Sequence, residues 1–528
     1  MHLTPTRSRI RLRAAAVAAA LGALLLAPLP AAQQAEAAAT LTNAGFESDA
    51  TGTATPAGWS TYSAAGQNAA SFTEAGGRSG GYRLSHWSAS AYKVETYQYL
   101  SGLANGTYTL SAWVRSGGGQ NAAYLALRNC GSAEQRTDLP VTSSGWIRIV
   151  TSVTVTGGAC TVSINSDAKA GNWLNVDDLT FTSGSTGLAV RGVDVSSLKK
   201  SEDLGGTYRT SAGTTGDPVA ILKNAGANYG RLKVWVNPAD GYNNKARVLA
   251  TAQRIKAQGM KLLVDFHYSD IWADPGAQSK PAAWQGHSYA QLRTDVYNHT
   301  YDVLNALKAQ GTTADMVQIG NEINTGMLWP EGSTSNWPQL AGLLNSGISA
   351  AKAVSSNTQI ALHLANGGDN ALYRTWFDNA TAQGVSYDVI AFSFYGYWHG
   401  ALSSLQANLD DISARYGKKV MVAETAYPFR LDSEDGHENI IDLSSELVSG
   451  YPAGAAGQSA WLRDVMNVVE AVPNGRGLGV FYWEPTWTAV TGNGWDPTDS
   501  SSGNGWENQA LFDYDSKLLP AATWLAHR

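Results

Sequence analysis

The chain has 528 residues, with 37 Lys and Arg, 43 Asp and Glu, and two Cys. At about 100–200 residues per domain, that length predicts two or more domains, or one large barrel with an appended domain. Apolar residues make up 44% of the chain and charged residues 15%, which excludes a mostly disordered protein. The formal net charge is −6 and no dense basic run follows residue 13, so no nucleic-acid partner is expected.

The aromatic residues are unevenly distributed, with 18 Trp and 23 Tyr against 10 Phe. Trp and Tyr combine a flat apolar face with a polar group, which suits stacking on ring-shaped polar ligands such as sugars. Ordinary core packing accounts for the same excess, so composition alone leaves both interpretations open.

The amino-terminal segment has the pattern of a secretory signal peptide, which we place at residues 1–37. Four Arg residues precede the apolar run Ala14–Leu29, and the run is followed by Ala35–Ala37, with a small residue at each end. A membrane anchor would need about 20 apolar residues, and this run is shorter. We therefore expect cleavage close to residue 37, a secreted extracellular protein and no membrane partner.

Residues 40–182 are expected to form an all-β domain. Short runs that alternate apolar and polar residues, such as 107–114, 146–150 and 160–164, are separated by Gly, Asn and Ser turns. No stretch here repeats apolar residues with a helical period. The pattern is typical of a β-sandwich, and residues 183–188 have the composition of a flexible linker.

Both cysteines, Cys130 and Cys160, fall in this β domain. An even pair in an oxidising compartment usually forms a disulfide, and closing a loop of this length contributes about 3–4 kcal/mol. No neighbouring His indicates a catalytic thiol, so we predict a structural disulfide.

From residue 189 to 528, apolar strands alternate with amphipathic helices. Asp217-Pro218 is typical of a helix start, and the helix predicted over 245–258 ends at Gly259. Eight such units predict a parallel (β/α)8 barrel. The expected fold class is therefore α/β, a TIM barrel preceded by an all-β jelly-roll sandwich. The predicted barrel strands are 192–195, 231–236, 262–266, 316–320, 360–364, 389–395, 420–423 and 478–483.

Polar residues gather where the predicted strands end, which is where barrel enzymes place their chemistry. Glu322 follows the fourth strand and Glu424 the seventh, so the two side chains can face each other across the barrel mouth. Glycoside cleavage needs one carboxylic acid to protonate the leaving oxygen and a second carboxylate to attack or to activate water. Asn321 is placed to hold a sugar hydroxyl. Isolated, solvated rim carboxylates are the alternative, which a pair ringed by aromatic residues disfavours.

The barrel, residues 189–528, resembles family 53 endo-β-1,4-galactanases. The long block that begins Asp265-Phe266-His267 is the specific part of the resemblance, whereas Gly320-Asn321-Glu322 alone would indicate only the wider clan of retaining glycoside hydrolases. The matching segments are Gly192–Ser197, Asp265–Pro275, Gln318–Ile323 and Glu424–Pro428.

By that resemblance, Glu322 is the general acid/base, Glu424 is the nucleophile, and the anomeric configuration is retained. Retention requires carboxyl groups about 5–5.5 Å apart. We expect the pKa of Glu322 to be raised by burial and by the negative charge of Glu424. Arg231 is expected to hold Glu424 ionised, and Tyr395 to form a hydrogen bond with it.

Other rim residues are candidates for binding the sugar or orienting the acid. Trp398 and Trp483 are expected to be stacking platforms, with barrel-closing core residues as the alternative. Glu484 is a third rim carboxylate, assigned to shaping the subsite under Trp483, with a catalytic role as its alternative. The polar candidates are Asp194, Arg231, Asp265, His267, Asp270, Asn321 and Tyr395.

Two polar loops are candidates for a structural calcium site. Asp435, His437 and Asn439 alternate in the loop after the seventh strand, and oxygen ligands at alternate positions suit calcium, with His437 offering its backbone carbonyl. The family resemblance implies a calcium that ties this loop to the one after the eighth strand, where Asn504 and Glu507 replace the Ser and Asp that the family leads us to expect. Two solvated loops are the alternative. Zinc is not expected, because no Cys is available.

The β domain resembles jelly-roll carbohydrate-binding modules in its first and last strands, around Phe46-Glu47 and Asp178-Leu179. In such modules the two ends often share a calcium, which would implicate Glu47 and Asp178. A protein-binding or cell-wall-binding domain, or a simple stabiliser, are the alternatives. Candidates for sugar stacking are Trp59, Trp87, Tyr92, Trp113 and Trp173.

The leading hypothesis is a secreted, monomeric endo-β-1,4-galactanase whose polysaccharide substrate is β-1,4-galactan or type I arabinogalactan. A retaining enzyme of the same clan that acts on mannan, xylan or glucan fits the fold and the paired Glu residues equally well. A lectin whose barrel has lost activity is the non-enzymatic alternative, although both Glu residues are present.

Overall fold

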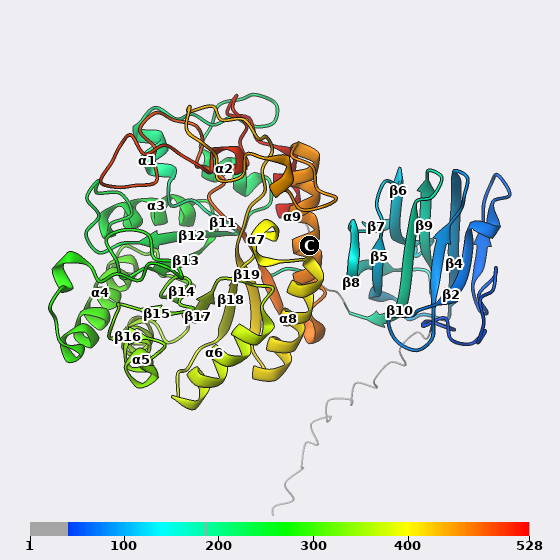
Figure 1. The fold of residues 1–528 in the computed structure, drawn as a ribbon, viewed down its shortest axis with the longest axis horizontal. Helices are drawn as coiled ribbons and strands as arrows, with labels where there is room; N and C mark the ends of the chain where they lie inside the picture. Colours follow the sequence, from blue (N-terminus) through cyan, green and yellow to red (C-terminus); the bar gives the residue numbers. More distant parts are fainter. Residues whose placement is uncertain (1–40, 185–186, 527–528) are drawn as a thin grey trace, which may run out of the picture. The chain divides into compact units, whose positions relative to one another are not determined.

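A computed structural model of the protein describes residues 41–184 and 187–526, apart from the side chains of residues 142–144 (Figure 1). The predicted signal peptide, residues 1–37, and residues 185–186 of the predicted linker lie outside the described residues. Within the described part of the chain, no helix is both long enough and apolar enough to cross a membrane.

The amino-terminal domain is a sandwich of two five-stranded antiparallel sheets. Burial alternates along β4, so every second side chain enters the core between the sheets. One sheet has the order β1 (Ser60–Tyr62), β4 (Tyr92–Ser101), β9 (Ala159–Ala168), β6 (Ala122–Arg128) and β7 (Gln135–Asp138). The other has the order β2 (Ser71–Ala75), β3 (Tyr82–Trp87), β10 (Trp173–Ser183), β5 (Gly106–Ser116) and β8 (Thr142–Val155).

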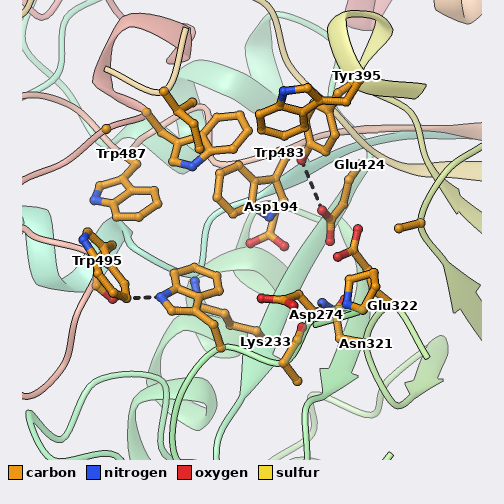
Figure 2. A pocket seen from close by; sticks show the side chains of 18 of the residues that line it. Asp194, Lys233, Asp274, Asn321, Glu322, Tyr395, Glu424, Trp483, Trp487 and Trp495 are labelled. Carbon is orange, nitrogen blue, oxygen red and sulfur yellow. Dashed lines mark hydrogen bonds between the residues drawn. The ribbon is translucent and has the colours of Figure 1, made fainter. Parts of the chain in front are cut away.

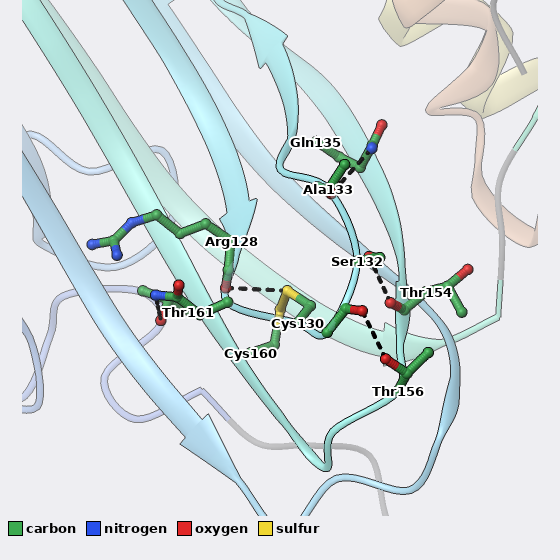
Figure 3. Close-up of a disulfide and its surroundings, with 11 residues drawn as sticks. Arg128, Cys130, Ser132, Ala133, Gln135, Thr154, Thr156, Cys160 and Thr161 are labelled. Atoms are coloured by element: carbon green, nitrogen blue, oxygen red, sulfur yellow. Dashed lines mark hydrogen bonds between the residues drawn. A yellow bond between two sulfur atoms is a disulfide. The ribbon is translucent and has the colours of Figure 1, made fainter.

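Cys130 and Cys160, the pair predicted to be bonded, are joined by a disulfide in this domain (Figure 3). Cys130 follows β6 and Cys160 lies in β9, its neighbour in the sheet, and both side chains are fully buried. The bond joins residues 30 positions apart, and cross-linking a loop of that size stabilises the fold by about 3–4 kcal/mol.

The second domain is a closed barrel of eight parallel strands, which follow one another around the barrel in chain order. All residues of β12 and β14 are buried, as expected for strands that pack against helices outside and against side chains inside. The strands are β11 (Val190–Asp194), β12 (Tyr229–Val234), β13 (Lys261–Phe266), β14 (Met316–Ile319), β17 (Gln359–Leu364), β18 (Val389–Ser393), β19 (Lys419–Thr425) and β20 (Gly477–Tyr482).

Helices cover the outside of the barrel (Figure 1). Asp217 caps α2 by accepting a hydrogen bond from the backbone N–H of Val219, as its position before Pro218 predicts. The helices are α1 (Leu198–Asp203), α2 (Pro218–Asn224), α3 (Lys245–Ala257), α4 (Tyr289–Ala309), α5 (Trp337–Val354), α6 (Asn370–Ala382), α7 (Gly396–His399), α8 (Leu402–Tyr416) and α9 (Ala455–Glu470). A short hairpin, β15 (Gly326–Met327) and β16 (Gly332–Ser333), follows β14.

The barrel interior is filled by a buried apolar cluster to which every strand contributes, including Leu263, Met316 and Phe481. No larger residue fits at Gly192, because a Cβ atom there would lie 2.1 Å from the Phe481 ring. One detail of the sequence prediction is wrong: Arg231 is the third residue of β12 and not its first, because β12 begins at Tyr229. Its side chain is only 1% exposed.

Candidate active site

The carboxyl ends of the barrel strands surround a cavity of about 860 Å³ (Figure 2). Polar side chains reach it from β11, β12, β13 and β19 and from the segments that follow β14 and β20. Glu322 and Glu424 both line it, and Figure 2 shows their carboxyl groups turned toward each other. The structure thus brings together the two carboxylates that the sequence singled out.

The backbone around both residues is irregular in ways that direct their side chains. Glu322 leaves β14 with φ of 46°, a left-handed conformation that non-glycine residues rarely adopt and that concentrates at functional sites. The pairing of β18 with β19 shifts register immediately before Ser393 and Glu424. Such a bulge re-aims the side chain that follows it, here Glu424.

Arg231 is the centre of the charged cluster beneath the cavity. Its Nη1 lies 2.8 Å from Glu424 Oε1 and 2.9 Å from Asp194 Oδ2, and its Nη2 lies 2.9 Å from Asp265 Oδ2. Burial alone would lower the pKa of Arg231, but the three carboxylates raise it, so the guanidinium stays charged.

The ion pair also determines the charge of Glu424. Burial raises the pKa of this carboxyl group, and the adjacent Arg231 opposes that shift. Tyr395 donates a hydrogen bond from its hydroxyl to Glu424 Oε2 at 3.1 Å. With a cation on one oxygen and a donor on the other, Glu424 is the member of the pair that carries the negative charge.

Glu322 has the opposite environment. Burial raises its pKa, and the negative charge of Glu424 raises it further. Ser393 donates a hydrogen bond to Oε1 at 2.5 Å, which partly counters the rise and leaves Oε2 to carry a proton. Two carboxyl groups whose pKa values are separated by their surroundings are the arrangement expected of an acid and a nucleophile.

Three buried residues that were not among the predicted site residues connect Glu322 to the charged cluster: Gln318, His363 and Ser393. Since Ser393 donates to Glu322, it accepts from His363 Nε2 at 2.9 Å, and His363 Nδ1 then accepts from Gln318 Nε2 at 2.9 Å. Burial lowers the pKa of His363 far below its usual value, so the ring is neutral. Their only sequence signal is a polar side chain within an apolar barrel strand.

Asn321 and His267 line the cavity, but most of their polar atoms form hydrogen bonds within the protein. Asn321 Oδ1 accepts from Arg231 at 3.1 Å and from Gln318 at 3.0 Å, and its Nδ2 donates to the carbonyl of Ala273. His267 Nδ1 accepts from two N–H groups, so its Nε2 carries the proton and donates to Asp265 at 3.1 Å.

Two other rim carboxylates have structural partners, and one of them, Asp270, is placed differently from the sequence expectation. Asp270 does not line the cavity; its oxygens accept the backbone N–H groups of Asn237 and Ala282 and so join two loops. Glu484 is 2% exposed and pairs with Lys233 at 2.8 Å, which favours a supporting role over the catalytic alternative.

Tryptophans form the walls of the cavity. Trp483 lies against Trp506 with ring centroids 4.6 Å apart, and Trp272 stacks on Trp487 at 5.8 Å. The Lys233 ammonium sits 4.0 Å from the Trp272 ring centroid, a cation–π contact. Trp398 is 50% exposed, so it is available as a platform and is not part of the core.

The sequence profile of Glycosyl hydrolase family 53 matches residues 190–525. The chain belongs to this family. The endo-β-1,4-galactanase of Bacillus subtilis is 36% identical over 366 residues, covering 63% of this chain and 84% of the relative. The arabinogalactan endo-β-1,4-galactanase A of Emericella nidulans is 37% identical over 324 residues, covering 60% and 89%.

Solved structures of the same family are similar to this barrel. The family 53 catalytic domain of Ignisphaera aggregans has a TM-score of 0.62 and 43% identity, covering 64% of this chain and 95% of that one. A fungal β-1,4-galactanase has a TM-score of 0.57 and 34% identity, covering 64% and 99%. The predicted family and barrel fold are confirmed, and the protein is a glycoside hydrolase.

The two loops predicted to share a calcium lie together in this family 53 barrel. Glu507 accepts the backbone N–H of Glu434 and of Asp435 from the other loop, and Asp435 Oδ2 accepts that of Asn504 at 2.8 Å. Asn439 Oδ1 is buried without a hydrogen-bond partner among the described residues. Two carboxylates at the junction of the loops, together with this unpartnered amide oxygen, are a donor set that fits an oxygen-liganded cation. Within the described ranges, no cluster of three His, Cys, Asp or Glu forms a metal site, so amide and carbonyl oxygens would complete it.

The residues of the β domain that were predicted to stack on sugars differ in how far they are buried. Trp59 and Tyr92 are core residues, 4% and 3% exposed, whereas Trp87 is 45% exposed. Glu47 accepts the backbone N–H of Tyr82 at 2.9 Å, and Asp178 pairs with Arg78 at 2.9 Å, so both predicted calcium ligands are engaged by the protein.

Proposed function

We propose that this protein is a secreted endo-β-1,4-galactanase that works with retention of configuration. The observation that carries the proposal is the contrast between two facing carboxyl groups: Glu424 is bound to Arg231, while Glu322 has a raised pKa and accepts a hydrogen bond from the Ser393 hydroxyl. The family membership and the names of the galactanase relatives support galactan as the substrate.

In the first step, Glu322 gives its proton to the glycosidic oxygen as the C1–O bond breaks. Glu424 attacks C1 from the opposite face and forms a covalent galactosyl ester. Arg231 and Tyr395 hold the attacking carboxylate in place and keep it ionised. In the second step, the Glu322 carboxylate removes a proton from water, the water oxygen bonds to C1, and the Glu424–C1 bond breaks.

The rest of the cavity positions the polymer. Trp398 and Trp483 present flat faces on which pyranose rings stack. Asp194 and Asp265 act chiefly through Arg231, since each is paired with it and almost fully buried. Lys233, held by Glu484, supports Trp272 from beneath.

The substrate is tested by incubating the protein with β-1,4-galactan, mannan, xylan and cellulose and separating the products by chromatography. Short galacto-oligosaccharides from galactan alone are expected, in sizes that show internal cleavage. Cleavage of a different polymer would keep the mechanism and reject the substrate. Binding without cleavage of any polymer would favour the lectin alternative.

Replacing Ser393 with Ala is expected to move the alkaline limb of the kcat/KM profile to higher pH and to lower kcat by about tenfold, the value of one hydrogen bond of about 1.4 kcal/mol. The Ser393 bond lowers the pKa of Glu322, so its loss raises that pKa and keeps the acid protonated to higher pH. The near-isosteric Ser393→Cys is expected to be intermediate. An unmoved alkaline limb in Ser393→Ala would contradict the assignment of Glu322 as the acid.

We also propose that the chain is exported and that its amino-terminal leader is removed. The disulfide supports this, because such bonds persist in oxidising compartments. Mass spectrometry of the secreted protein is expected to find an amino terminus close to residue 38; an intact amino terminus would reject cleavage.

We propose a structural calcium at the joined loops, held by Asp435, Asn439, Glu507 and the His437 carbonyl. Removing calcium with EDTA is expected to lower the melting temperature by a few degrees, since ligand at about 100 times Kd stabilises by about 2.7 kcal/mol. Added calcium restores the transition, and Asn439→Ala makes the protein insensitive to both treatments. Melting that EDTA leaves unchanged would reject the site.

A further inference from the structure

A second cavity lies on the outer face of one sheet of the amino-terminal sandwich, far along the chain from the catalytic residues. Its volume is about 530 Å³, and residues of β2, β3, β5 and β10 line it. We call it the sandwich groove. Its lining residues are Phe72, Glu74, Arg83, Ser85, Trp87, Arg115, Trp173 and Asn175.

Strand alternation explains why these side chains share one face. In β3, Leu84 and His86 are buried in the core, so Arg83, Ser85 and Trp87 point to the opposite side. The strand register then sets the groove residues side by side: Trp87 is opposite Trp173, and Asn175 is opposite both Ser85 and Arg115.

The aromatic part of the groove is available to a ligand. Trp87 is 45% exposed, so its indole ring is accessible from the groove. Trp173 lies directly across from it, and the Arg115 guanidinium sits 5.7 Å from the Trp173 ring centroid. An exposed indole beside a second indole is a surface on which the apolar face of a pyranose ring can stack.

The polar part of the groove presents fixed donors and acceptors. Glu74 uses Oε1 for its bonds to both Arg83 and Ser85, and its side chain is 42% exposed. Arg115 Nε donates to Asn175 Oδ1 at 2.9 Å, and Asn175 Nδ2 donates to Ser85 at 2.7 Å. Arg83 Nε is buried without a hydrogen-bond partner in the described part of the chain.

These groups match a neutral polyhydroxy ligand better than a charged one. Sugar hydroxyls both donate and accept, so the same ligand can satisfy the Glu74 carboxylate and the Arg guanidinium groups. An anion would be repelled by the negative charge of Glu74, and a cation would be repelled by the positive charges of Arg83 and Arg115.

We propose that the sandwich groove is a sugar-binding site, in which Trp87 stacks on a galactosyl ring of β-1,4-galactan and Glu74, Arg83 and Arg115 bind its hydroxyls. The choice of galactan rests on the proposed function of the barrel. A site of this kind holds the barrel at its polymer and raises its effective concentration there without changing the cleavage step.

Calorimetric titration of the full chain with galacto-oligosaccharide tests the proposal, with Glu424→Ala introduced in every sample to prevent hydrolysis. Two sites per chain are expected, one in the barrel and one in the sandwich. Adding Trp87→Ala, or Arg115→Gln, is expected to remove one site or to weaken it at least about tenfold, which is 1.4 kcal/mol. Tyr99→Ala is the matched control, because Tyr99 is an exposed aromatic, 60% accessible, on the other sheet.

With Glu424 restored, Trp87→Ala is expected to slow release of sugar from insoluble galactan and to leave turnover of soluble oligosaccharide unchanged. If the barrel cleaves galactan but sugar binding does not change in the Trp87 and Arg115 variants, sugar binding in the groove is rejected and the proposed function still holds. If sugar binding depends on Trp87 but the wild-type chain does not cleave galactan, the proposed function is rejected and sugar binding in the groove still holds.

Discussion

Replacement of Glu424 with Ala is expected to lower kcat on β-1,4-galactan by about 10⁴-fold or more, the scale of loss when a covalent nucleophile is removed. Asp194 and Asp265, the other two carboxylates on Arg231, are both held by that guanidinium and do not take over the attack. The measurement is the initial rate of reducing-end release, with circular dichroism as the check that the variant folds.

Azide distinguishes the nucleophile from the acid. With an aryl β-galactoside chain as substrate, azide is expected to fill the space left in Glu424→Ala and attack C1 from that face, giving an α-galactosyl azide. In Glu322→Ala, azide is expected to replace water in the second step and give the β-galactosyl azide. The reverse pairing of variant and product would exchange the two roles assigned here.

Replacement of Arg231 with Met is expected to cost about 3–5 kcal/mol of the free energy of unfolding at neutral pH, because breaking a buried ion pair leaves charges without a counter-ion. Three carboxylates, those of Asp194, Asp265 and Glu424, share this guanidinium. Without it the folded-state pKa of Glu424 rises, so the stability that this carboxyl group contributes is present at low pH and is lost as pH rises through that value. The deficit, measured by chemical denaturation, should therefore shrink as pH falls.

The same variant is expected to lose turnover, and the acidic limb of its kcat/KM profile should move to higher pH. Arg231 lowers the pKa of Glu424, so its removal makes the nucleophile protonate earlier as the pH falls. Arg231→Lys keeps the charge but not the forked geometry, and should recover part of both losses. Wild-type turnover in Arg231→Met would contradict the role given to this ion pair.

Local patterns in the sequence were sufficient to predict the barrel and the two carboxyl groups that face each other at its mouth. Each barrel strand is an apolar run bounded by helix signals, and Glu322 and Glu424 stand immediately where two of these runs end. Because the strands of the barrel end around one opening, both carboxyl groups reach the same cavity, as their positions at strand ends predict.

What the sequence did not show depends on side chains that meet only in the folded chain. Ser393 and His363 look like ordinary strand residues, and their bonds to Glu322 and Gln318 join separate strands. Asp270 stands in the most specific sequence block, yet it serves two loops. Likewise, the sequence does not distinguish Trp59, which is buried just before β1, from Trp87, which is exposed at the end of β3 opposite Trp173.

The most direct test of the account is the configuration of the first product. Proton NMR of wild-type enzyme with a β-1,4-galacto-oligosaccharide resolves the anomeric proton of the new reducing end before mutarotation equalises the two anomers. The double displacement by Glu424 and water predicts that the β anomer appears first, and that the α anomer follows only at the rate of mutarotation. An α anomer at the earliest times would mean single displacement by water, and would contradict Glu424 as a nucleophile.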